Sequence, residues 1–245
     1  MKKSLIIIFL LVLISAANLT ISQDTNIAKY LPLKVGNTWI YYFQGYYQFY
    51  GFQSGYNKYK ITGTQNVNGK IFYSFQSVTV MVTGTLGCDC SELSQFYGTR
   101  LDSTTGVISI NNNCAGNVLL LYDSLKAKLR DTSHTCRSSY PFDRIACVDT
   151  NITGIFNNSY STKYFVYQAQ EGGEARRYAK ALGIIYYDRG IMQGTCHSDL
   201  KGCVINGVVY GDTSMIVGII PVSTETPKSL IFTKTIPIRS IRLQK

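Results

Sequence analysis

The chain has 245 residues, with 24 Lys and Arg against 14 Asp and Glu, and a formal net charge of +10. Charged residues make up 16% and aromatic residues 13%, with 19 Tyr. This composition excludes a disordered, collagenous or coiled-coil chain, because the charge is too low and the apolar content too high. The length suits one all-β domain or two small domains.

The first 22 residues have the pattern of a secretory signal peptide. Lys2 and Lys3 form a positive start, and the run Leu5–Ala17 is interrupted only by Ser15. Its 13 residues are too few for a stable membrane span. Small residues permit cleavage after Ala17 or after Ser22, and the second site leaves less apolar sequence behind. The sequence therefore predicts a signal peptide over residues 1–22 and use of the export machinery, with no membrane-spanning helix.

The body of the chain, residues 28–219, is typical of one β-rich domain. Around Trp39 the pattern places alternate side chains on opposite faces of a strand. Asn68-Gly69 and Asn206-Gly207 are two-residue hairpin signals, and residues 176–187 form a further strand with a bend or bulge at Gly183. We expect a mainly β fold of about ten strands, with little helix. The expected architecture is a single antiparallel, meander-type curved sheet, arranged as a sandwich or a partly open barrel.

Residues 39–59 contain eleven aromatic residues among 21. In a strand with one solvated face, some of these rings must be exposed, whereas others fill the core or form cross-strand pairs. Exposed rings can stack on sugars or peptides. The predicted contact surface consists of Tyr46, Tyr47, Phe49, Tyr50, Phe52 and Tyr56.

Seven cysteines suggest disulfides in an oxidising compartment. We expect the pairs Cys196–Cys203 and Cys136–Cys147, with Cys114 joined to Cys88 or Cys90 and one thiol left over. The alternative is a zinc site built from His134, Cys136, Cys196 and His197, but these spacings match no common ligand pattern. The sequence therefore predicts neither a metal nor a cofactor.

No catalytic motif is recognisable in the sequence. A Cys–His pair such as Cys196 with His134 is conceivable, but an oxidised cysteine cannot attack a substrate. Paired acids occur at Asp89 with Glu92 and at Glu171 with Glu174, both in turn-like segments. The sequence therefore predicts no catalytic residue.

The leading hypothesis is an exported, non-enzymatic protein with a binding or structural role and a glycan or protein ligand. The alternatives are a secreted hydrolase acting on glycans or peptides and a periplasmic carrier of an apolar ligand. Carboxylates or a Cys–His pair in a cleft would favour the hydrolase. A deep apolar cavity lined by Tyr and Leu would favour the carrier.

The end of the chain differs from the body. Residues 220–229 are predicted to be a linker, and residues 230–245 contain four basic and no acidic residues. Read from the third base of the Leu230 codon, the codons through Lys245 permit Asn-Leu-Tyr-Gln-Asn-Tyr-Pro-Asn-Pro-Phe-Asn-Pro-Thr-Thr-Lys. That string resembles the start of the C-terminal sorting domain of bacterial type IX secretion cargo. We interpret residues 230–245 as a disordered, out-of-frame remnant of such a domain; the alternative is a genuine basic tail.

The body also resembles a known group of proteins. The segments Leu31–Trp39, Tyr178–Tyr187 and Leu200–Thr213 are similar to segments of uncharacterised secreted bacterial proteins that carry type IX sorting domains. The resemblance implies a secreted or cell-surface location, or a periplasmic one if the tail is truly out of frame. It implies no activity and no functional residues.

The basic residues do not suggest a nucleic-acid partner. Two of the 24 lie in the signal peptide and four in the tail, so 18 remain against 14 acidic residues, a net charge of +4. They are scattered apart from Lys126–Arg130 and the pair Arg176 and Arg177. We therefore expect no nucleic acid as a partner.

Overall fold

The computed structural model describes residues 25–84, 98–114, 117–134, 144–169, 172–191 and 193–214. The predicted signal peptide, the linker over 220–229 and the tail over 230–245 lie outside these residues. The described part is a single antiparallel sheet with one short helix, α2 (Thr25–Ala28). This confirms the predicted mainly β, curved-sheet fold. No helix among the described residues is long and apolar enough to cross a membrane.

Thirteen strands form the sheet. Their bounds are β1 (Thr38–Tyr47), β2 (Gly51–Val67), β3 (Lys70–Thr83), β4 (Thr99–Leu101), β5 (Val107–Cys114), β6 (Asn117–Ser124), β7 (Thr132–His134), β8 (Arg144–Ile155), β9 (Asn158–Ala169), β10 (Gly172–Ala179), β11 (Gly183–Ile191), β12 (Gly194–Ile205) and β13 (Val208–Gly211).

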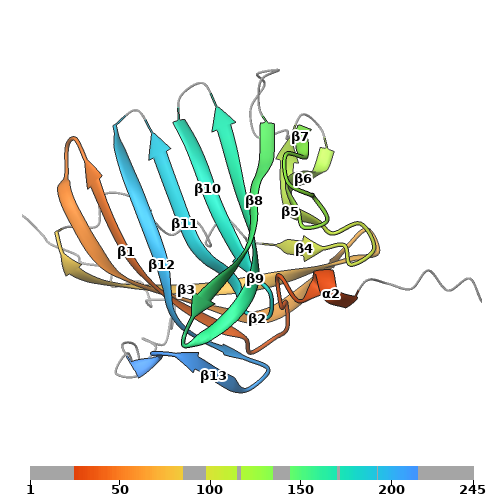
Figure 1. Ribbon diagram of the computed structural model, residues 1–245, viewed down its shortest axis with the longest axis horizontal. Coiled ribbons are helices and arrows are strands. Elements are labelled where there is room, and N and C mark those ends of the chain that lie inside the picture. Colours follow the sequence, from red (N-terminus) through yellow and green to blue (C-terminus); the bar gives the residue numbers. More distant parts are fainter. Residues whose placement is uncertain are drawn as a thin grey trace, which may run out of the picture.

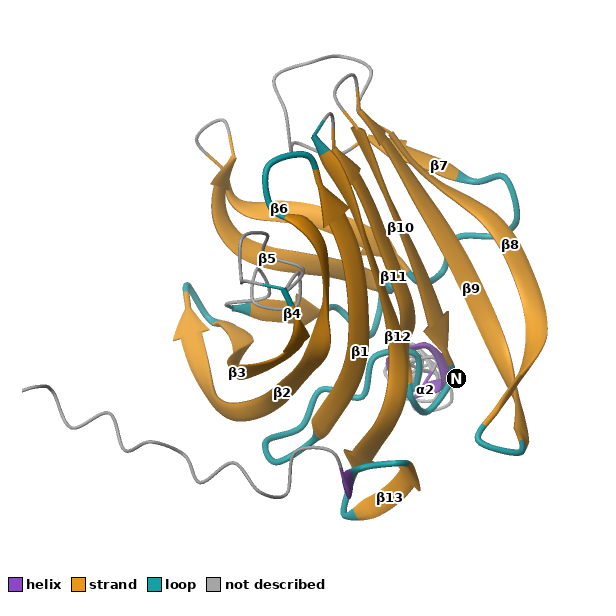
Figure 2. Cartoon of the chain, turned by 90° about the vertical axis from the view of Figure 1, so that its left-hand side faces the viewer, coloured by secondary structure: helices purple, strands orange, loops and turns teal. Residues whose placement is uncertain are grey.

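The strand order makes the sheet nearly close on itself. It runs β6-β5-β4-β3-β2-β1-β12-β11-β10-β9-β8-β7, with β13 paired to β12. The sheet curls into a barrel-like shape (Figures 1 and 2). Its two edges, β6 and β7, are consecutive in the chain, and the segment between them hydrogen-bonds to both sides. The Leu125 amide donates to the Gly106 carbonyl at 2.7 Å, and the Arg130 amide donates to the Cys147 carbonyl at 2.7 Å.

Two hairpins form as the sequence predicts. Asn68 and Gly69 connect β2 to β3 with φ of 50° and 76°, and Asn206 and Gly207 connect β12 to β13 with φ of 53° and 83°. Both central residues of such a turn need positive φ, which asparagine and glycine tolerate. These turns fix the register of the strands that flank them.

The predicted strand over residues 176–187 is wrong, because it is two strands joined by a tight turn. Ala179 pairs with Gly183, and φ is positive at Ala181 (73°) and Gly183 (90°). A side chain at Gly183 would meet the Trp39 indole nitrogen at 3.1 Å. The same indole donates to the Leu182 carbonyl at 2.6 Å, so the turn is held from β1.

The main hydrophobic core contains residues from most strands of the curved sheet, and a smaller cluster holds Phe43 and Cys196. Trp39, Tyr59, Tyr178 and Leu182 belong to the main core and are at most 3% exposed. Tyr41 donates a hydrogen bond from its hydroxyl to the Ile184 carbonyl at 2.7 Å, which satisfies a polar group inside the core. Trp39 and Tyr41 of β1 belong to this core, and Phe43 belongs to the smaller cluster, whereas Ile40 between Trp39 and Tyr41 is also buried.

Candidate functional site

A row of side chains crosses the core-facing side of the sheet. Direct cross-strand pairing places Phe43, Ser198, Tyr187, Arg176, Phe165 and Cys147 next to one another, from β1 to β8. All six residues are buried. An arginine in such a row needs compensation, because an unpaired buried charge is costly. We call this set the inner row.

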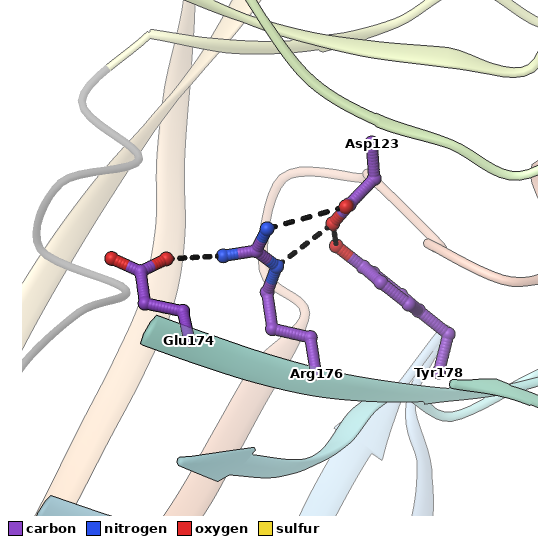
Figure 3. A network of polar contacts seen from close by, with 4 residues as sticks. All are labelled: Asp123, Glu174, Arg176 and Tyr178. Atoms are coloured by element: carbon purple, nitrogen blue, oxygen red, sulfur yellow. Dashed lines mark hydrogen bonds and ion pairs between the residues drawn. The ribbon is translucent and has the colours of Figure 1, made fainter. Parts of the chain in front are cut away.

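Arg176 obtains that compensation from the opposite edge of the sheet. Its Nε lies 2.9 Å from Asp123 Oδ2 and its Nη2 lies 3.2 Å from Asp123 Oδ1, which is a bidentate ion pair between β10 and β6. Arg176 is 1% exposed and Asp123 is 0% exposed. Tyr178 donates its hydroxyl to Asp123 Oδ2, and Glu174 accepts from Arg176 Nη1, both at 2.5 Å (Figure 3).

This network explains how the sheet holds its curl. The strands β6 and β10 are far apart in the strand order and make no ladder with each other. Arg176 and Tyr178 both rise from β10 to one carboxylate on β6 (Figure 3). The pair therefore joins two strands that are not neighbours in the sheet, in addition to the backbone hydrogen bonds made by residues 125–130. Sequence analysis missed the network; the available signal was the alternation of Glu174, Arg176 and Tyr178 along one strand face.

A second row crosses the outer side of the same strands. Direct pairing aligns residues from seven strands, β2, β1, β12, β11, β10, β9 and β8: Tyr56, Tyr42, Asp199, Tyr186, Arg177, Tyr164 and Asp149. On its strand, each of these residues is next to a residue that faces the inner side; at the β8 bulge, Asp149 is two residues from Cys147. The aromatic members are half-buried. We call this set the outer row.

Contacts link the members of the outer row. The rings of Tyr42 and Tyr56 lie 5.2 Å apart, and those of Tyr164 and Tyr186 lie 6.0 Å apart. The Arg177 guanidinium lies 4.8 Å from the Tyr164 ring and 3.4 Å from Asp149 Oδ2. The row thus combines aromatic surface with charges that are already paired.

His197 stands beside the outer row on β12. Its Nε2 lies 3.0 Å from Asp199 Oδ2, and its ring meets the Tyr186 ring edge-on at 4.9 Å. Burial, together with the nearby Asp188 carboxylate, raises the pKa of Tyr186 to about 12. Burial also raises the pKa of Asp188, although the neighbouring His197 opposes that shift. Tyr186 is therefore a neutral hydrogen-bonding group near pH 7.

The predicted contact surface is divided between two environments. Tyr46, Phe49, Tyr50 and Phe52 lie at the end of the β1–β2 hairpin and are 56%, 73%, 55% and 54% exposed. We call these four the aromatic tip. Tyr47 is partly buried against the small cluster of Phe43 and Cys196, and Tyr56 is partly buried in the outer row. That the tip contacts a ligand stays a prediction.

The structure contradicts two of the predicted disulfides. Cys203 and Cys147 are free and buried, so the pairs Cys196–Cys203 and Cys136–Cys147 are absent. Residues 194–205 form the strand β12 rather than the expected loop. Seven residues of extended strand separate Cys196 from Cys203 by about 24 Å, far beyond the span of a disulfide. Cys196 is disulfide-bonded, to neither of these two.

The other cysteines of the predicted pairs cannot be placed. Cys88 and Cys136 lie outside the described residues, and so does Cys90. The side chain of Cys114 is likewise not described. The pairing of Cys114 with Cys88 or Cys90 therefore stays a prediction.

The proposed catalytic and metal groups do not assemble among the described residues. Cys196 and His197 point to opposite faces of β12, since Cys196 is buried with Phe43 and His197 contacts Tyr186. Glu174 accepts from Arg176, while its predicted partner Glu171 lies outside the described residues, as do Asp89 and Glu92. In the described part no group of three or more His, Cys, Asp or Glu side chains is arranged to hold a metal. The side chain of His134 is not described.

The described part of the surface includes a larger and a smaller hollow. One of about 420 Å³ lies beside the segment from Ala28 to Asn37 and is completed by Tyr73, Leu101 and Asn206. The other, of about 300 Å³, is lined by residues of the segment between β6 and β7, such as Lys126 and Asp131, together with Cys147 of β8. Both linings mix polar and apolar groups. The larger hollow contains Tyr73 and three leucines, so it has part of the Tyr and Leu lining expected of a carrier of an apolar ligand.

Comparisons with known proteins give only distant likenesses. No family model matches the chain, and no curated protein matches it in sequence. Among solved structures, it is similar to a protein of Bacteroides fragilis NCTC 9343 that is inferred to be exported and has a YmcC-like fold. That match has a TM-score of 0.39 and 10% identity, covering 73% of this chain and 97% of the other.

A second solved structure is equally distant. It is an inferred lipoprotein of Parabacteroides distasonis ATCC 8503, with a TM-score of 0.40 and 10% identity, covering 71% of this chain and 97% of the other. Likenesses at this level carry no argument about the function of this chain, which must come from its own residues.

Proposed function

We propose that this protein is an exported, non-enzymatic binding protein that contacts an extracellular or envelope ligand through the aromatic tip. The observation that carries the proposal is the exposure of four large aromatic side chains, each more than half accessible, at the end of one hairpin. Burying them on a partner would remove apolar surface from water at little entropic cost, because aromatic side chains have few rotatable bonds. Clustered exposure of this kind marks interaction sites.

The tip is rigidly supported, which favours binding over a purely structural role. Tyr46 pairs directly with Phe52 across the hairpin and with Thr195 on β12. The Gln48 amide donates to the Gln193 carbonyl at 2.9 Å, so the turn itself is tied to the neighbouring β11–β12 connection. A surface that is ordered before binding loses less entropy when its partner arrives.

Export is supported by the sequence features at the N-terminus. The charged start and short apolar run would direct the chain through the Sec pathway, and cleavage would remove residues 1–22. Fractionation of the producing cells should find the mature protein outside the cytoplasm. Recovery of the uncleaved chain in the cytosol would refute this part of the proposal.

The destination beyond the inner membrane depends on the C-terminal tail. We propose that a single-base change near codon 230 separates the chain from a type IX sorting domain. An intact domain would give a secreted or surface protein, and the shifted frame would leave it in the periplasm. Sequencing the gene tests this, because one inserted base near codon 230 must restore both the motif and a longer reading frame. A gene without that property means that the basic tail is genuine.

The binding proposal is tested with a tip variant and a matched control. The variant Tyr46→Ser/Phe49→Ser/Tyr50→Ser removes exposed rings only. The control Ile71→Ser/Ile152→Ser/Val209→Ser removes apolar side chains that are 55%, 70% and 59% exposed elsewhere on the sheet. We expect the parent protein and the control to sediment with isolated cell envelopes of the producing bacterium. The tip variant should bind the envelopes at least about tenfold more weakly. Equal binding by all three proteins would refute the proposed contact surface.

A further inference from the structure

The aromatic tip is the end of a longer strip on the outer face of the sheet. Along β1, Tyr46, Gln44 and Tyr42 point to this face because side chains alternate along a strand. Their direct partners extend the strip sideways. Phe52 lies opposite Tyr46, Tyr56 lies opposite Tyr42, and β12 adds His197 opposite Gln44 and Asp199 opposite Tyr42.

Two pairs of rings therefore lie along β1 with hydrogen-bonding groups between them. Four residues separate Tyr46–Phe52 from Tyr42–Tyr56, a distance of about 14 Å along an extended strand. Between the pairs, Gln44 is exposed and the side chain of His197 is 30% exposed. The side chain of Asp199 is 42% exposed and lies beside the second pair. The strip alternates apolar faces with an amide, an imidazole and a carboxylate.

The charge distribution limits the ligand chemistry. Residues 35–57 contain no Asp, Glu, Lys or Arg, in a chain whose formal net charge is +10. Within the strip, Asp199 and His197 contact each other, and the Lys201 ammonium lies 5.7 Å from the Tyr42 ring at the far end. Within the described part of the chain, an anionic polymer or a phosphate group would meet no Lys or Arg of β1 or β2 at the tip or beside Gln44, and Lys58 and Lys201 lie at the Tyr42–Tyr56 end of the strip. The strip therefore suits a ligand without charge.

We infer that the ligand is a neutral polysaccharide whose chain lies along β1 on this outer face. Such a polymer matches the strip because its sugar rings present apolar C–H faces, whereas its hydroxyl groups point sideways. The C–H faces would rest on the two aromatic pairs, and the hydroxyl groups would bond with Gln44, His197 and Asp199. This inference rests on the proposed function, since it identifies what the aromatic tip binds.

The experiment uses the full-length mature protein in affinity electrophoresis. The gels contain either a neutral polymer (a β-glucan, a xyloglucan, a galactomannan or dextran) or an acidic one (alginate or polygalacturonate). We expect at least one neutral polymer to retard the protein and the acidic polymers to leave its mobility unchanged. Retardation by acidic polymers alone, or by no polymer, would overturn the inference.

Three variants locate the binding on the strip. Gln44→Ala changes only an exposed amide, and Tyr42→Ala removes one ring of the second pair. Tyr42→Phe keeps that ring and removes its hydroxyl. We expect Tyr42→Ala to weaken polymer binding about tenfold, Gln44→Ala to weaken it severalfold, and Tyr42→Phe to retain it. Ile152→Ala, far from the strip on β8, is the control and should bind normally. Should Tyr42→Ala fail to fold, the Gln44→Ala result decides alone; unchanged polymer binding by a folded Tyr42→Ala or by Gln44→Ala overturns the inference.

Envelope binding separates this inference from the function on which it rests. If cell envelopes bind the protein through the tip while every neutral polymer fails, the tip contacts a protein or a lipid surface and only the polysaccharide inference is lost. Tip-dependent binding to vesicles of neutral phospholipid would have the same meaning. If envelope binding ignores the tip variant, the proposed function itself is refuted.

Discussion

Arg176 and Arg177 are neighbours in the chain, but they stand on opposite faces of β10. Arg176 is 1% exposed and makes a bidentate pair with a fully buried carboxylate, Asp123. Arg177 is 25% exposed, lies 3.4 Å from Asp149 and rests over the Tyr164 ring. The first arginine joins two distant parts of a curved sheet, whereas the second belongs to a solvated row on its outside. The same residue type therefore has two roles, which burial decides.

The largest contrast should appear in the stability of the two alanine variants. Arg176→Ala leaves the Asp123 charge buried without its partner, so we expect the free energy of unfolding to fall by about 3–5 kcal/mol. Arg177→Ala removes a surface pair and should cost about 1 kcal/mol or less. Urea denaturation followed by Trp39 fluorescence measures both. Similar losses for the two variants would break the comparison.

Replacing both members of the buried pair sharpens this result. The variant Asp123→Leu/Arg176→Met removes both fully buried charges, whereas Glu174, whose side chain is 11% exposed, loses its contact with Arg176 just as it does in Arg176→Ala. We expect the double variant to be more stable than Arg176→Ala, because the main cost of breaking a buried pair is the charge left behind. A double variant that is less stable than Arg176→Ala would show that the pair itself, rather than the orphaned Asp123, supplies the stability.

The buried contacts around Asp123 also predict an effect of a single hydroxyl group on stability. Tyr178→Phe removes the hydrogen bond that Tyr178 donates to Asp123 and leaves the ring in place. A hydrogen bond to a charged group is worth about 1.5–3 kcal/mol, and we expect a loss of stability in that range. On the outer row, Tyr42→Phe should change stability by about 0.5 kcal/mol or less. Equal effects would mean that the Tyr178 hydroxyl gains nothing from burial.

The sequence predicted the parts of the fold that depend on local signals. Asn68-Gly69 and Asn206-Gly207 are read correctly because the turn chemistry needs no distant partner. The hairpin around Ala181 was missed, since the hydrogen bonds that hold this turn come from Trp39 on β1 and from the Lys29 carbonyl, both far away in the chain. A non-glycine residue in that conformation gives no local signal.

The candidate sites were harder to predict, because they depend on register. Cys196 and Cys203 look like a short closed loop in sequence, whereas pairing with β1 and β11 makes the segment a central strand. The outer row needs seven aligned strands, and the Asp123–Arg176 pair needs the curl of the whole sheet. Exposure of some rings in residues 46–56 was predicted from aromatic residues on both faces of a strand whose one face was taken to be solvated.

Alkaline pH should lower the stability of the protein through the buried thiol of Cys203. Burial raises the pKa of this thiol from about 9 to about 12, so its neutral form stabilises the fold. That contribution is complete below pH 9, the value in the unfolded chain, and is lost as the pH rises toward 12. We expect the free energy of unfolding of the parent protein to fall as the pH rises from 9 to 12. In Cys203→Ala, the decrease relative to that variant's own free energy of unfolding at pH 8 should be smaller. Parallel curves for the two proteins would assign the alkaline loss to other groups, such as Tyr41.

The smallest expected effect is a difference in how salt changes the coupling energies of the two arginine–aspartate pairs. A double-mutant cycle over Arg177 and Asp149 should give a coupling energy of about 0.2–1 kcal/mol, which declines as ionic strength rises because both groups are exposed to solvent. The same cycle over Arg176 and Asp123 should give a larger coupling that salt scarcely changes, because both groups are removed from solvent. Both cycles are measured by urea denaturation at low salt and at 1 M salt, with the same single and double alanine variants. If salt weakens the coupling between Arg176 and Asp123 as well, water reaches this buried pair, and the contrast between the two arginines is lost.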